Sequence, residues 1–499
     1  MDLQKFNSIQ SFGYNRFPVP HSVLGSYNMG IAYPLGYVPV PIGGSIQNSI
    51  EIFMRSSQLV DPSFLDCDIN IGHYFVSYEA MDPWYKIRAQ RFKGKSEDQE
   101  TLNFVFQEGA RYDELKPYLT AGSLMDHLGY SLHDVAQIAP EKSLSGTVEF
   151  NGYPVLAYNM IVDRFFRNSR LQDVELTRKF VLGNFSDQSA SLEYHLAKQG
   201  DEISISGEQV DLLMLRYVNF EPDYFTTARP DASGKAVSIP TGDQGTIPNL
   251  LDAMLLQKVA DMIEHGGYSY NDYARILYGQ EPNNDECDYP VFLGGSSGPL
   301  QVSTVVNQTP LSAGSEVGVS DGLGEEGGRV TGYLSGGNGF SRRFTRGGIY
   351  MPIMWIRPKT YYRSGVSPFF KETSIGSQLV PQLADMQDAP IYQSEVARSF
   401  TQFLEMAETE EVFGYKDRYQ EYRSIPNRVV GELRDKRTGW YIGRTIDTMK
   451  ISNEFISQNH LTYSPWVVTD GSKDHFFGRI HHNMTLTEPL PMTSRPWVW

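Results

Sequence analysis

Short β-branched and aromatic runs, bounded by Gly, Pro or polar clusters, are the most frequent hydrophobic pattern along this chain. Runs of this kind are typical of β-strands. We expect strands over residues 49–53, 70–78, 148–150, 302–306 and 349–356. The hydrophobic pattern therefore favours a mainly β fold.

Helical patterns are fewer. Apolar residues on one stripe, with a proline near the start and Gly266-Gly267 beyond the end, predict a helix over residues 248–265. A capping-box-like start and a closing glycine predict a second helix over residues 269–279. A third is expected over residues 156–166, where apolar side chains share one face.

Glycine residues are concentrated in one part of the chain, which indicates the kind of connection between the strands. Residues 291–350 contain 15 glycines, which favours long loops over a helical domain. Many short strands, long loops and a few inserted helices predict a β-sandwich or jelly roll. We expect a single domain over residues 49–499, with helices inserted at about 100–290 and glycine-rich loops at 291–350.

The N-terminal residues 1–48 have a different character. Five prolines lie between Phe12 and Ile42, and little helical periodicity is present. We expect an extended arm that lies on another surface, because its aromatic side chains would be costly to leave in water. The arm residues expected to contact a neighbouring subunit are Phe12, Tyr14, Phe17, Tyr33 and Tyr37.

Composition limits the possible functions. The chain has 499 residues, of which 40% are hydrophobic and 13% aromatic, so it is not a disordered polypeptide. Its net charge of −16 excludes a uniform coat on nucleic acid, so any DNA contact must be local. Two cysteines suit a reducing compartment, and we find neither a secretory signal nor an apolar run long enough for a membrane span.

Motifs associated with enzymes lack the required context. The run Gly294–Gly298 matches the G-x-S-x-G pattern of serine hydrolases, but a strand is expected after it, so we interpret it as a Gly-Ser turn. Asp66 and Asp68 begin like a calcium loop that then lacks its glycine and its glutamate, leaving only an isolated cation as an alternative. We predict no catalytic residue, no cofactor and no metal site.

The most informative charge feature is the segment 341–363. It contains six basic residues and no acidic residue, and aromatic residues interleave with the charges. Such a mixture can hold a single-stranded backbone while bases stack on rings. The alternative is a strand pair that packs its aromatics inward and pairs its cations with carboxylates. The candidate DNA contacts are Arg342, Arg343, Arg346, Arg357, Lys359 and Arg363.

The segment 413–423, with the sequence FGYKDRYQEYR, carries a second aromatic–arginine pattern. Tyr415, Arg418, Tyr419 and Tyr422 have helical i, i+3, i+4 and i+7 spacing. We therefore expect a helix whose stripe faces a partner subunit.

Several segments together resemble the major capsid protein of the microviruses, small icosahedral single-stranded DNA phages, and especially its gokushovirus-like branch. The resemblance covers most of the chain. Besides FGYKDRYQEYR and the helices at 250–279, it rests on the DYFTT run at 223–227, YPVFLGGSSGPLQVSTVVNQT at 289–309, GSLMDHLG at 122–129 and LAYNMIVDRFFRNSRLQD at 156–173.

This resemblance implies an eight-stranded viral jelly roll with long inserted loops and a few short helices. It implies a structural, non-enzymatic subunit of a T=1 icosahedral shell around a circular single-stranded DNA phage genome. The implied partners are further copies of the chain, a small basic DNA-binding protein, an internal scaffolding protein, a DNA pilot protein, the packaged DNA and a host surface receptor. The implied location is the virion, assembled in the bacterial host cytoplasm.

Two other classes of protein fit the β-rich pattern. A phage receptor-binding or lectin-like protein would expose an aromatic platform on a monomer or trimer. A β-rich glycoside hydrolase would need two carboxylates in a cleft.

Overall fold

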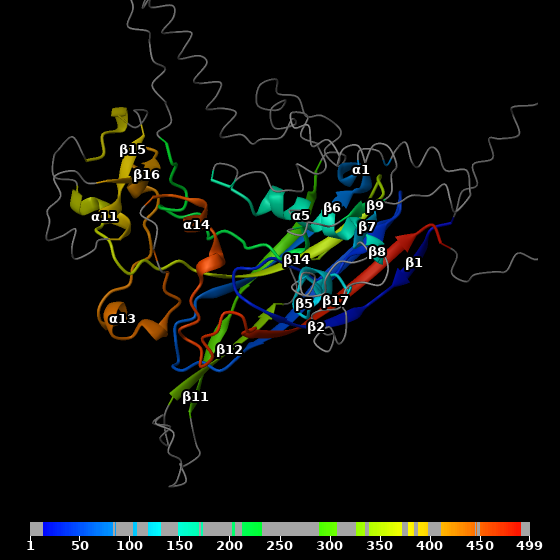
Figure 1. Cartoon of the computed structure of the whole chain (residues 1–499), viewed down its shortest axis with the longest axis horizontal. Helices are drawn as coiled ribbons and strands as arrows, with labels where there is room; N and C mark the ends of the chain where they lie inside the picture. Colours follow the sequence, from blue (N-terminus) through cyan, green and yellow to red (C-terminus); the bar gives the residue numbers. More distant parts are fainter. Residues whose placement is uncertain are drawn as a thin grey trace, which may run out of the picture.

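The computed structural model (Figure 1) describes more than half of the chain in separate stretches. These are residues 13–82, 85, 103–106, 118–130, 148–168, 171–172, 202–204, 212–231, 289–306, 326–334, 339–371, 378–383, 388–397, 411–444, 446 and 450–490. Phe12 and the helices expected over residues 248–265 and 269–279 lie outside these described residues.

Two antiparallel sheets form the body of the molecule. The larger sheet has seven strands, which are β1 (Asn15–Pro18), β2 (His21–Tyr27), β5 (Ser45–Ser56), β11 (Gln301–Val306), β12 (Glu326–Leu334), β13 (Phe340–Arg343) and β17 (Phe476–Glu488). The smaller sheet has five strands, which are β3 (Tyr33–Pro34), β4 (Val38–Val40), β6 (Cys67–Ser77), β10 (Val291–Pro299) and β14 (Gly348–Pro358). The longest strands, β5, β6, β14 and β17, lie centrally and set the direction of both sheets (Figure 1).

The inner faces of the two sheets pack against each other to form the main core. Along β5 the even-numbered side chains are buried, whereas odd-numbered ones such as Glu51 and Phe53 are exposed. Ile50 and Ile52 of β5 share one buried cluster with Ile69 of β6. This period of two is what a sheet with one face on the core requires. The prediction of a mainly β, jelly-roll sandwich is confirmed.

The second face of the five-stranded sheet is covered as well, which explains why β6 is buried along almost its whole length. Helix α5 (Tyr153–Phe165) lies across this face, and its Leu156 and Ile161 pack in one cluster with Val76 of β6 and Met351 of β14. The helix expected at residues 156–166 is therefore confirmed. Three layers result, in the order helix, small sheet and large sheet (Figure 1).

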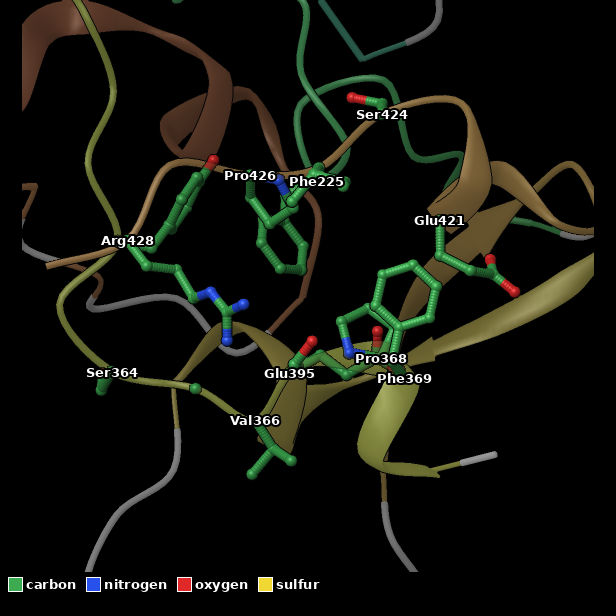
Figure 2. Close-up of a pocket in the computed structure, with 14 residues that line it drawn as sticks. Phe225, Ser364, Val366, Pro368, Phe369, Glu395, Glu421, Ser424, Pro426 and Arg428 are labelled. Carbon is green, nitrogen blue, oxygen red and sulfur yellow. The ribbon is translucent and has the colours of Figure 1, made fainter. Parts of the chain in front are cut away.

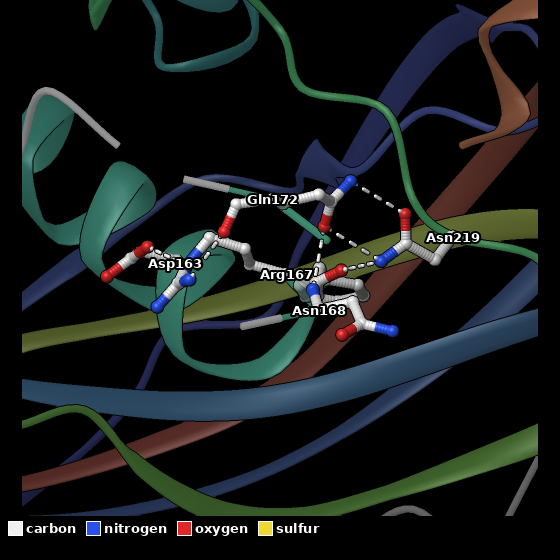
Figure 3. A network of polar contacts seen from close by, with 6 residues as sticks. Asp163, Arg167, Asn168, Gln172 and Asn219 are labelled. Carbon is white, nitrogen blue, oxygen red and sulfur yellow. Dashed lines mark hydrogen bonds and ion pairs between the residues drawn. The ribbon is translucent and has the colours of Figure 1, made fainter. Parts of the chain in front are cut away.

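The C-terminal end of α5 is tied to the rest of the chain by a polar network (Figure 3). Arg167 pairs with Asp163 and donates a hydrogen bond to the backbone of Gln172. The side-chain amides of Gln172 and Asn219 exchange two hydrogen bonds of 3.1 Å, and Asn219 also donates to the Phe166 carbonyl at 2.8 Å. These bonds satisfy the helix end, which would otherwise expose unpaired carbonyls.

Smaller elements surround the sandwich. A three-stranded sheet is formed by β7 (Asn103–Phe106), β8 (Val148–Asn151) and β9 (Glu202–Ser204), and α1 (Tyr78–Met81) and α4 (Leu124–His127) lie nearby in sequence. A separate lobe (Figure 1, yellow to orange) contains β15 (Ala389–Tyr392), β16 (Val412–Lys416), α11 (Gln393–Val396), α13 (Glu432–Asp435) and α14 (Asn453–Ile456). The 3-10 turns that the structure describes are η5 (Pro368–Lys371), η7 (Pro381–Leu383), η8 (Gln420–Tyr422), η9 (Thr438–Trp440) and η10 (Gln458–His460).

The five strands expected from the hydrophobic pattern are confirmed as parts of β5, β6, β8, β11 and β14. The Gly-Ser turn expected at Gly294–Gly298 is wrong, because these residues lie inside β10. A register shift follows Phe292, and Gly294 adopts a φ of +147°, which favours glycine. A side chain on Gly295 would lie 2.3 Å from the Ile71 carbonyl oxygen, so the glycines permit close strand pairing rather than a turn.

The described part of the N-terminal arm, residues 13–44, pairs with the sheets of its own chain. Strands β1 and β2 pair with β17, and β3 and β4 pair with β14. The arm therefore covers strands that would otherwise be sheet edges. Residues 13–44 thus pair with their own chain, and contact of the exposed arm residues with a neighbouring subunit stays a prediction. Of the twelve strands in the two sheets, these four come from the arm, which leaves the expected eight.

A histidine lies buried on the inner face of β17. His482 is 1% exposed, and its ring stacks on that of His21 with 4.5 Å between the ring centres. Burial lowers the pKa of His482 to about 3, and the nearby His21, His73 and His481 add to this effect. The folded chain therefore holds His482 in its neutral form.

We expect acid to destabilise the fold through this residue. The pKa of His482 is lower in the folded chain than its usual 6.5, so between pH 6.5 and 3 mainly the unfolded chain binds the proton. At pH 5 this difference should cost about 2 kcal/mol of the free energy of unfolding. Urea unfolding at pH 7 and pH 5 should show a smaller pH dependence for His482→Phe. His460→Gln, at an exposed position, serves as control. If His482→Phe leaves the pH dependence of the free energy of unfolding unchanged, the lowered pKa of His482 is contradicted.

Candidate nucleic-acid and subunit interfaces

Three of the six candidate DNA-contact residues pair with carboxylates of the same chain. The nitrogen–oxygen distances are 2.7 Å for Arg346 and Glu79, 3.4 Å for Lys359 and Asp66, and 3.7 Å for Arg363 and Asp435. All three cationic side chains are more than a third exposed, so each pair contributes only about 0–1 kcal/mol. Their charge is nevertheless balanced locally, which weakens their attraction for phosphate.

The other three candidates lie in two different sheets. Arg342 and Arg343 belong to β13 of the large sheet, whereas Arg357 belongs to β14 of the small sheet. Arg343 donates a hydrogen bond to the Gly43 carbonyl at 3.2 Å, and burial lowers the pKa of Arg357. The structure therefore does not gather the six residues into one basic strip, and their contact with DNA stays a prediction.

Asp66, considered with Asp68 as the holder of an isolated cation, already has partners. It accepts a hydrogen bond of 2.7 Å from the Tyr361 hydroxyl and pairs with Lys359. Burial and this hydrogen bond raise the pKa of Tyr361 to about 12. In the part of the chain that the structure describes, no group of three or more His, Cys, Asp or Glu side chains could hold a metal ion.

The helix expected over residues 413–423 is wrong. Tyr415 lies in strand β16, a turn follows, and Tyr419 adopts a left-handed conformation with φ of 64° before η8. Tyr419 is buried whereas Tyr422 is 43% exposed, so these side chains do not form one stripe. The guanidinium of Arg418 lies 5.3 Å from the centre of the Tyr419 ring. Pairing of β16 with β15 stabilises the strand over the helix that the spacing suggested.

This segment instead packs against the DYFTT run inside the lobe. The backbones of Tyr415 and Arg229 exchange hydrogen bonds of 2.7 and 2.8 Å. The Arg229 guanidinium pairs with Asp388 at 2.9 Å and with Asp417 at 2.8 Å. Arg229 is 9% exposed, so both ion pairs are largely shielded from water. They join three segments that are far apart in sequence, around residues 229, 388 and 417. Two of the motifs that carry the family resemblance thus form one structural unit.

Asp223 organises the DYFTT turn itself. One of its carboxylate oxygens accepts hydrogen bonds from the backbone of Phe225 at 2.9 Å and of Thr226 at 2.8 Å. The other accepts a hydrogen bond of 2.7 Å from the Tyr362 hydroxyl. Burial and the Asp223 charge raise the pKa of Tyr362, which therefore acts as a hydrogen-bond donor. Side-chain bonds of this kind fix a turn without regular secondary structure.

A buried lysine lies at the centre of the lobe. The Lys416 ammonium pairs with Glu421 at 2.9 Å and lies 4.2 Å from the centre of the Tyr224 ring. The Tyr224 hydroxyl contacts Lys416 and donates a hydrogen bond to Glu395 at 3.0 Å. Burial lowers the pKa of Lys416, although the Glu421 carboxylate opposes this effect. Two opposite charges therefore hold β16 against η8.

A pocket opens beside this cluster (Figure 2). Phe225, Phe369 and Pro426 surround it, and Arg428 projects towards it from the opposite wall. Glu395 and Glu421 also line it. A glycoside hydrolase would use two such carboxylates, but here Tyr224 and Lys416 already bind them. The pocket is thus built as part of the packing of the lobe.

Exposed apolar side chains gather at the rim of this pocket. Phe370 is 81% exposed, Ile425 67%, Tyr422 43% and Phe369 39%. The rings of Phe369 and Tyr422 pack edge to face with their centres 5.4 Å apart. Contiguous apolar patches of this kind mark interaction sites. Of these four residues, only Tyr422 was expected from the sequence. The adjacent Phe369-Phe370 pair, which follows Ser367-Pro368, was the signal for the others.

The aromatic residues of the arm fall into two groups. Tyr14 is 47% exposed, Tyr37 is 37% exposed and Phe17 is half-buried, so their contact with a neighbouring subunit stays a prediction. Tyr33 is 3% exposed in the core of its own chain, and its hydroxyl accepts a hydrogen bond from the Asn28 backbone. Tyr33 is therefore corrected from an interface residue to a core residue, because strand β3 turns it inward.

Comparison with known proteins identifies the family. A family described as Capsid protein (F protein) matches residues 244–498, just over half of the chain. The chain belongs to this capsid protein family. The expected microvirus resemblance is thereby confirmed at the level of the family.

Individual relatives support the same assignment. The chain is 22% identical over 267 residues to capsid protein VP1 of Chlamydia phage 1, covering 52% of this chain and 44% of that protein. It is 22% identical over 261 residues to capsid protein VP1 of Bdellovibrio phage phiMH2K, covering 50% and 46%, and 22% identical over 269 residues to capsid protein VP1 of Spiroplasma virus 4, covering 50% and 45%. The matched region thus spans a little under half of each of these capsid proteins.

None of the helices that the structure describes is both long enough and apolar enough to cross a bilayer.

The two groups of arm aromatics should differ in their effect on stability. Tyr33→Ala removes a buried ring and should lower the free energy of unfolding by about 3–5 kcal/mol. Tyr37→Ala, a matched change at an exposed position of the arm, should cost less than about 1 kcal/mol. Thermal and urea unfolding of the soluble chain would measure both. Equal losses would show that Tyr33 is not a core residue.

The buried ion pair of the lobe should be more costly to break than to replace. Lys416→Met leaves Glu421 unpaired, and Glu421→Gln leaves Lys416 unpaired, so each should lower stability by about 3–5 kcal/mol. The double variant removes both charges and should lose less than the sum of the two single changes. Urea unfolding of the four proteins gives the coupling energy. Additive losses would show that the two charges do not interact.

Proposed function

We propose that this chain is the repeating subunit of a T=1 icosahedral shell that encloses a circular single-stranded DNA phage genome. The match of residues 244–498 to the Capsid protein (F protein) family carries this proposal. The two-sheet sandwich with long insertions supports it, because such insertions supply contacts between subunits while the sheets keep their shape. The virion is then its location, and the cytoplasm of a bacterial host its place of assembly.

Contacts around several symmetry axes require several surfaces, of which only those at a twofold axis are self-complementary. The apolar rim formed by Phe369, Phe370, Tyr422 and Ile425 is one candidate. Tyr415 and Arg418 lie in the same lobe and stay candidates for subunit contact. The exposed arm residues Tyr14, Phe17 and Tyr37 supply a second candidate at a distance from the lobe in sequence.

Charge determines which partners the shell needs. A subunit with net charge −16 cannot neutralise the packaged DNA by itself, so a small basic DNA-binding protein and counterions must contribute. An internal scaffolding protein, a DNA pilot protein and a host surface receptor complete the proposed set of partners. Arg342 and Arg343 of β13 and Arg357 of β14 stay candidates for DNA contact within segment 341–363.

The two other classes considered from the sequence are less well supported. The glycoside hydrolase would need free carboxylates in a cleft, whereas Glu395 and Glu421 are bound to Tyr224 and Lys416. The receptor-binding protein would share the β-rich fold, but the matching family is described as a capsid protein. Neither alternative is retained.

Electron microscopy of the concentrated full-length chain tests the proposal. We expect closed particles of uniform diameter, and Phe370→Glu should prevent their formation because it places a charge in an apolar contact. The melting temperature of the soluble Phe370→Glu chain should stay within about 2 °C of the unmodified one, since a surface substitution changes stability by about 0.5 kcal/mol or less. Thr469→Glu, at an exposed polar position distant from the rim in sequence, is the charge-matched control. A chain that remains monomeric under all assembly conditions would refute the proposal.

A further inference from the structure

The outward face of the seven-stranded sheet carries an arrangement that the sequence analysis did not identify. Two segments with the same pattern, Phe53-Met54-Arg55 on β5 and Phe477-Gly478-Arg479 on β17, pair antiparallel. Phe477 lies opposite Arg55, and Arg479 lies opposite Phe53. Residues directly opposite each other in a sheet share one face. Two phenylalanines and two arginines therefore alternate both along each strand and across the strand pair.

This face is open to solvent. Phe53 is 41% exposed and Phe477 is 52% exposed, and both arginines are exposed. The Arg55 guanidinium lies 4.9 Å from the centre of the Phe53 ring. The neighbouring strands extend the apolar surface, because Tyr333 of β12 lies opposite Phe53 and is 65% exposed. We call the surface formed by Phe53, Arg55, Tyr333, Phe477 and Arg479 the sheet platform.

The charge on this face is opposite to that of the whole chain. Among the outward strand positions that the structure describes, Glu51 is the one acidic residue. The exposed arginines at outward positions are Arg16, Arg55, Arg329, Arg343 and Arg479. No ion pair joins any of these five to a described carboxylate. A chain with net charge −16 thus presents a positive face, which is complementary to a polyanion.

We propose that the sheet platform binds single-stranded DNA. Bases stack on the rings of Phe53, Tyr333 and Phe477, while Arg55 and Arg479 contact the phosphates between them. Exposed rings interleaved with arginines are what sequence-tolerant binding of single strands requires, because every base has a face that can stack. The inference rests on the proposed function, because the shell would enclose such DNA. It assigns the contact to a surface that contains no residue of segment 341–363.

A second copy of the chain fits this surface less well. A subunit contact would cover the three rings with apolar side chains and would pair each arginine with a carboxylate in a fixed position. The platform instead places Arg479 opposite Phe53 and Arg55 opposite Phe477. Its neighbours on β2 and β12 are the polar Ser26 and Thr331 and one exposed apolar side chain, Leu24. A flexible polyanion with flat bases satisfies both kinds of group at once.

Fluorescence anisotropy with a labelled 20-nucleotide oligo-dT, titrated with the soluble full chain at several salt concentrations, tests the proposal. The double variant Phe53→Thr/Phe477→Thr should weaken binding by at least about tenfold, because two stacking surfaces are removed. The double variant Arg55→Gln/Arg479→Gln should weaken binding and reduce the slope of log affinity against log salt by about 1.4, at about 0.7 per phosphate contact. A duplex of the same length should bind the unmodified chain more weakly, since its bases cannot stack on the rings.

Matched substitutions elsewhere serve as controls. Phe64→Thr changes a ring that is 65% exposed, and Arg437→Gln changes an arginine that is 56% exposed, and neither lies on the platform. Both should bind oligo-dT like the unmodified chain. Unchanged melting temperatures would show that all variants are folded. Oligo-dT binding that is absent, or that the platform variants leave unaltered, would overturn the proposal.

Particle formation by the same variants separates this inference from the proposed function. Platform variants that assemble normally but bind oligo-dT weakly support both. Platform variants that bind oligo-dT normally but fail to assemble would show that the face joins two copies of the chain, and would overturn the inference. An unmodified chain that binds oligo-dT through the platform but never forms particles would overturn the shell and leave the platform as a DNA-binding surface.

Discussion

Burial of one face of each sheet against the other is the interaction on which the rest of this structure depends. The side chains of Ile50 and Ile52 on β5, Ile480 on β17, and Ile69 and Ile356 on the opposite sheet form one cluster that water does not reach. Each such side chain contributes about 1.5–3 kcal/mol when it is buried. Because the four longest strands supply this cluster, their register is constrained, and a slip of one residue would expose the whole set.

The same constraint creates the outward surface. When every second residue of β5 and β17 must face the core, the residues between them must face away from it. Phe53 and Arg55 on one strand, and Phe477 and Arg479 on the other, are brought together only because both strands obey this alternation in a fixed antiparallel register. The packing of the interior thus holds in place a surface suited to an external partner.

The lobe follows a different principle. Its core contains aromatic rings such as Tyr224 and Phe413, but its segments are short and have little regular structure. Buried polar groups therefore take over part of the positioning, as the Arg229 and Lys416 ion pairs show. Such ion pairs add little net stability compared with apolar packing. An arrangement that left one buried charge without its partner would be strongly destabilised, so the pairs select one arrangement of the segments. The exposed rim formed by Phe369, Phe370, Tyr422 and Ile425 is carried on this defined base.

The amino-acid sequence determined the local features whose cause is local. The alternating and β-branched runs predicted β5, β6, β11 and β14. A strand with one buried face needs alternation and a strand buried on both faces needs a continuous apolar run, whatever either packs against. The apolar stripe predicted α5 for the same reason. Recognition of the family also needed only the sequence, because its motifs are contiguous segments.

Tertiary structure decided what depends on pairing between distant segments. The helical spacing of Tyr415 and Tyr422 gave no helix, because β15 and the backbone of Arg229 supply strand partners that the spacing cannot reveal. Tyr33 and Tyr37 are near neighbours in sequence, yet only the first is buried, since β3 pairs with β14 at that point. Half of the basic residues of segment 341–363 meet carboxylates from elsewhere in the chain, and the positive, aromatic face formed by β5 and β17 exists only through their register. Contacts between residues hundreds of positions apart are set by the packing of whole sheets, and a one-dimensional pattern does not contain them.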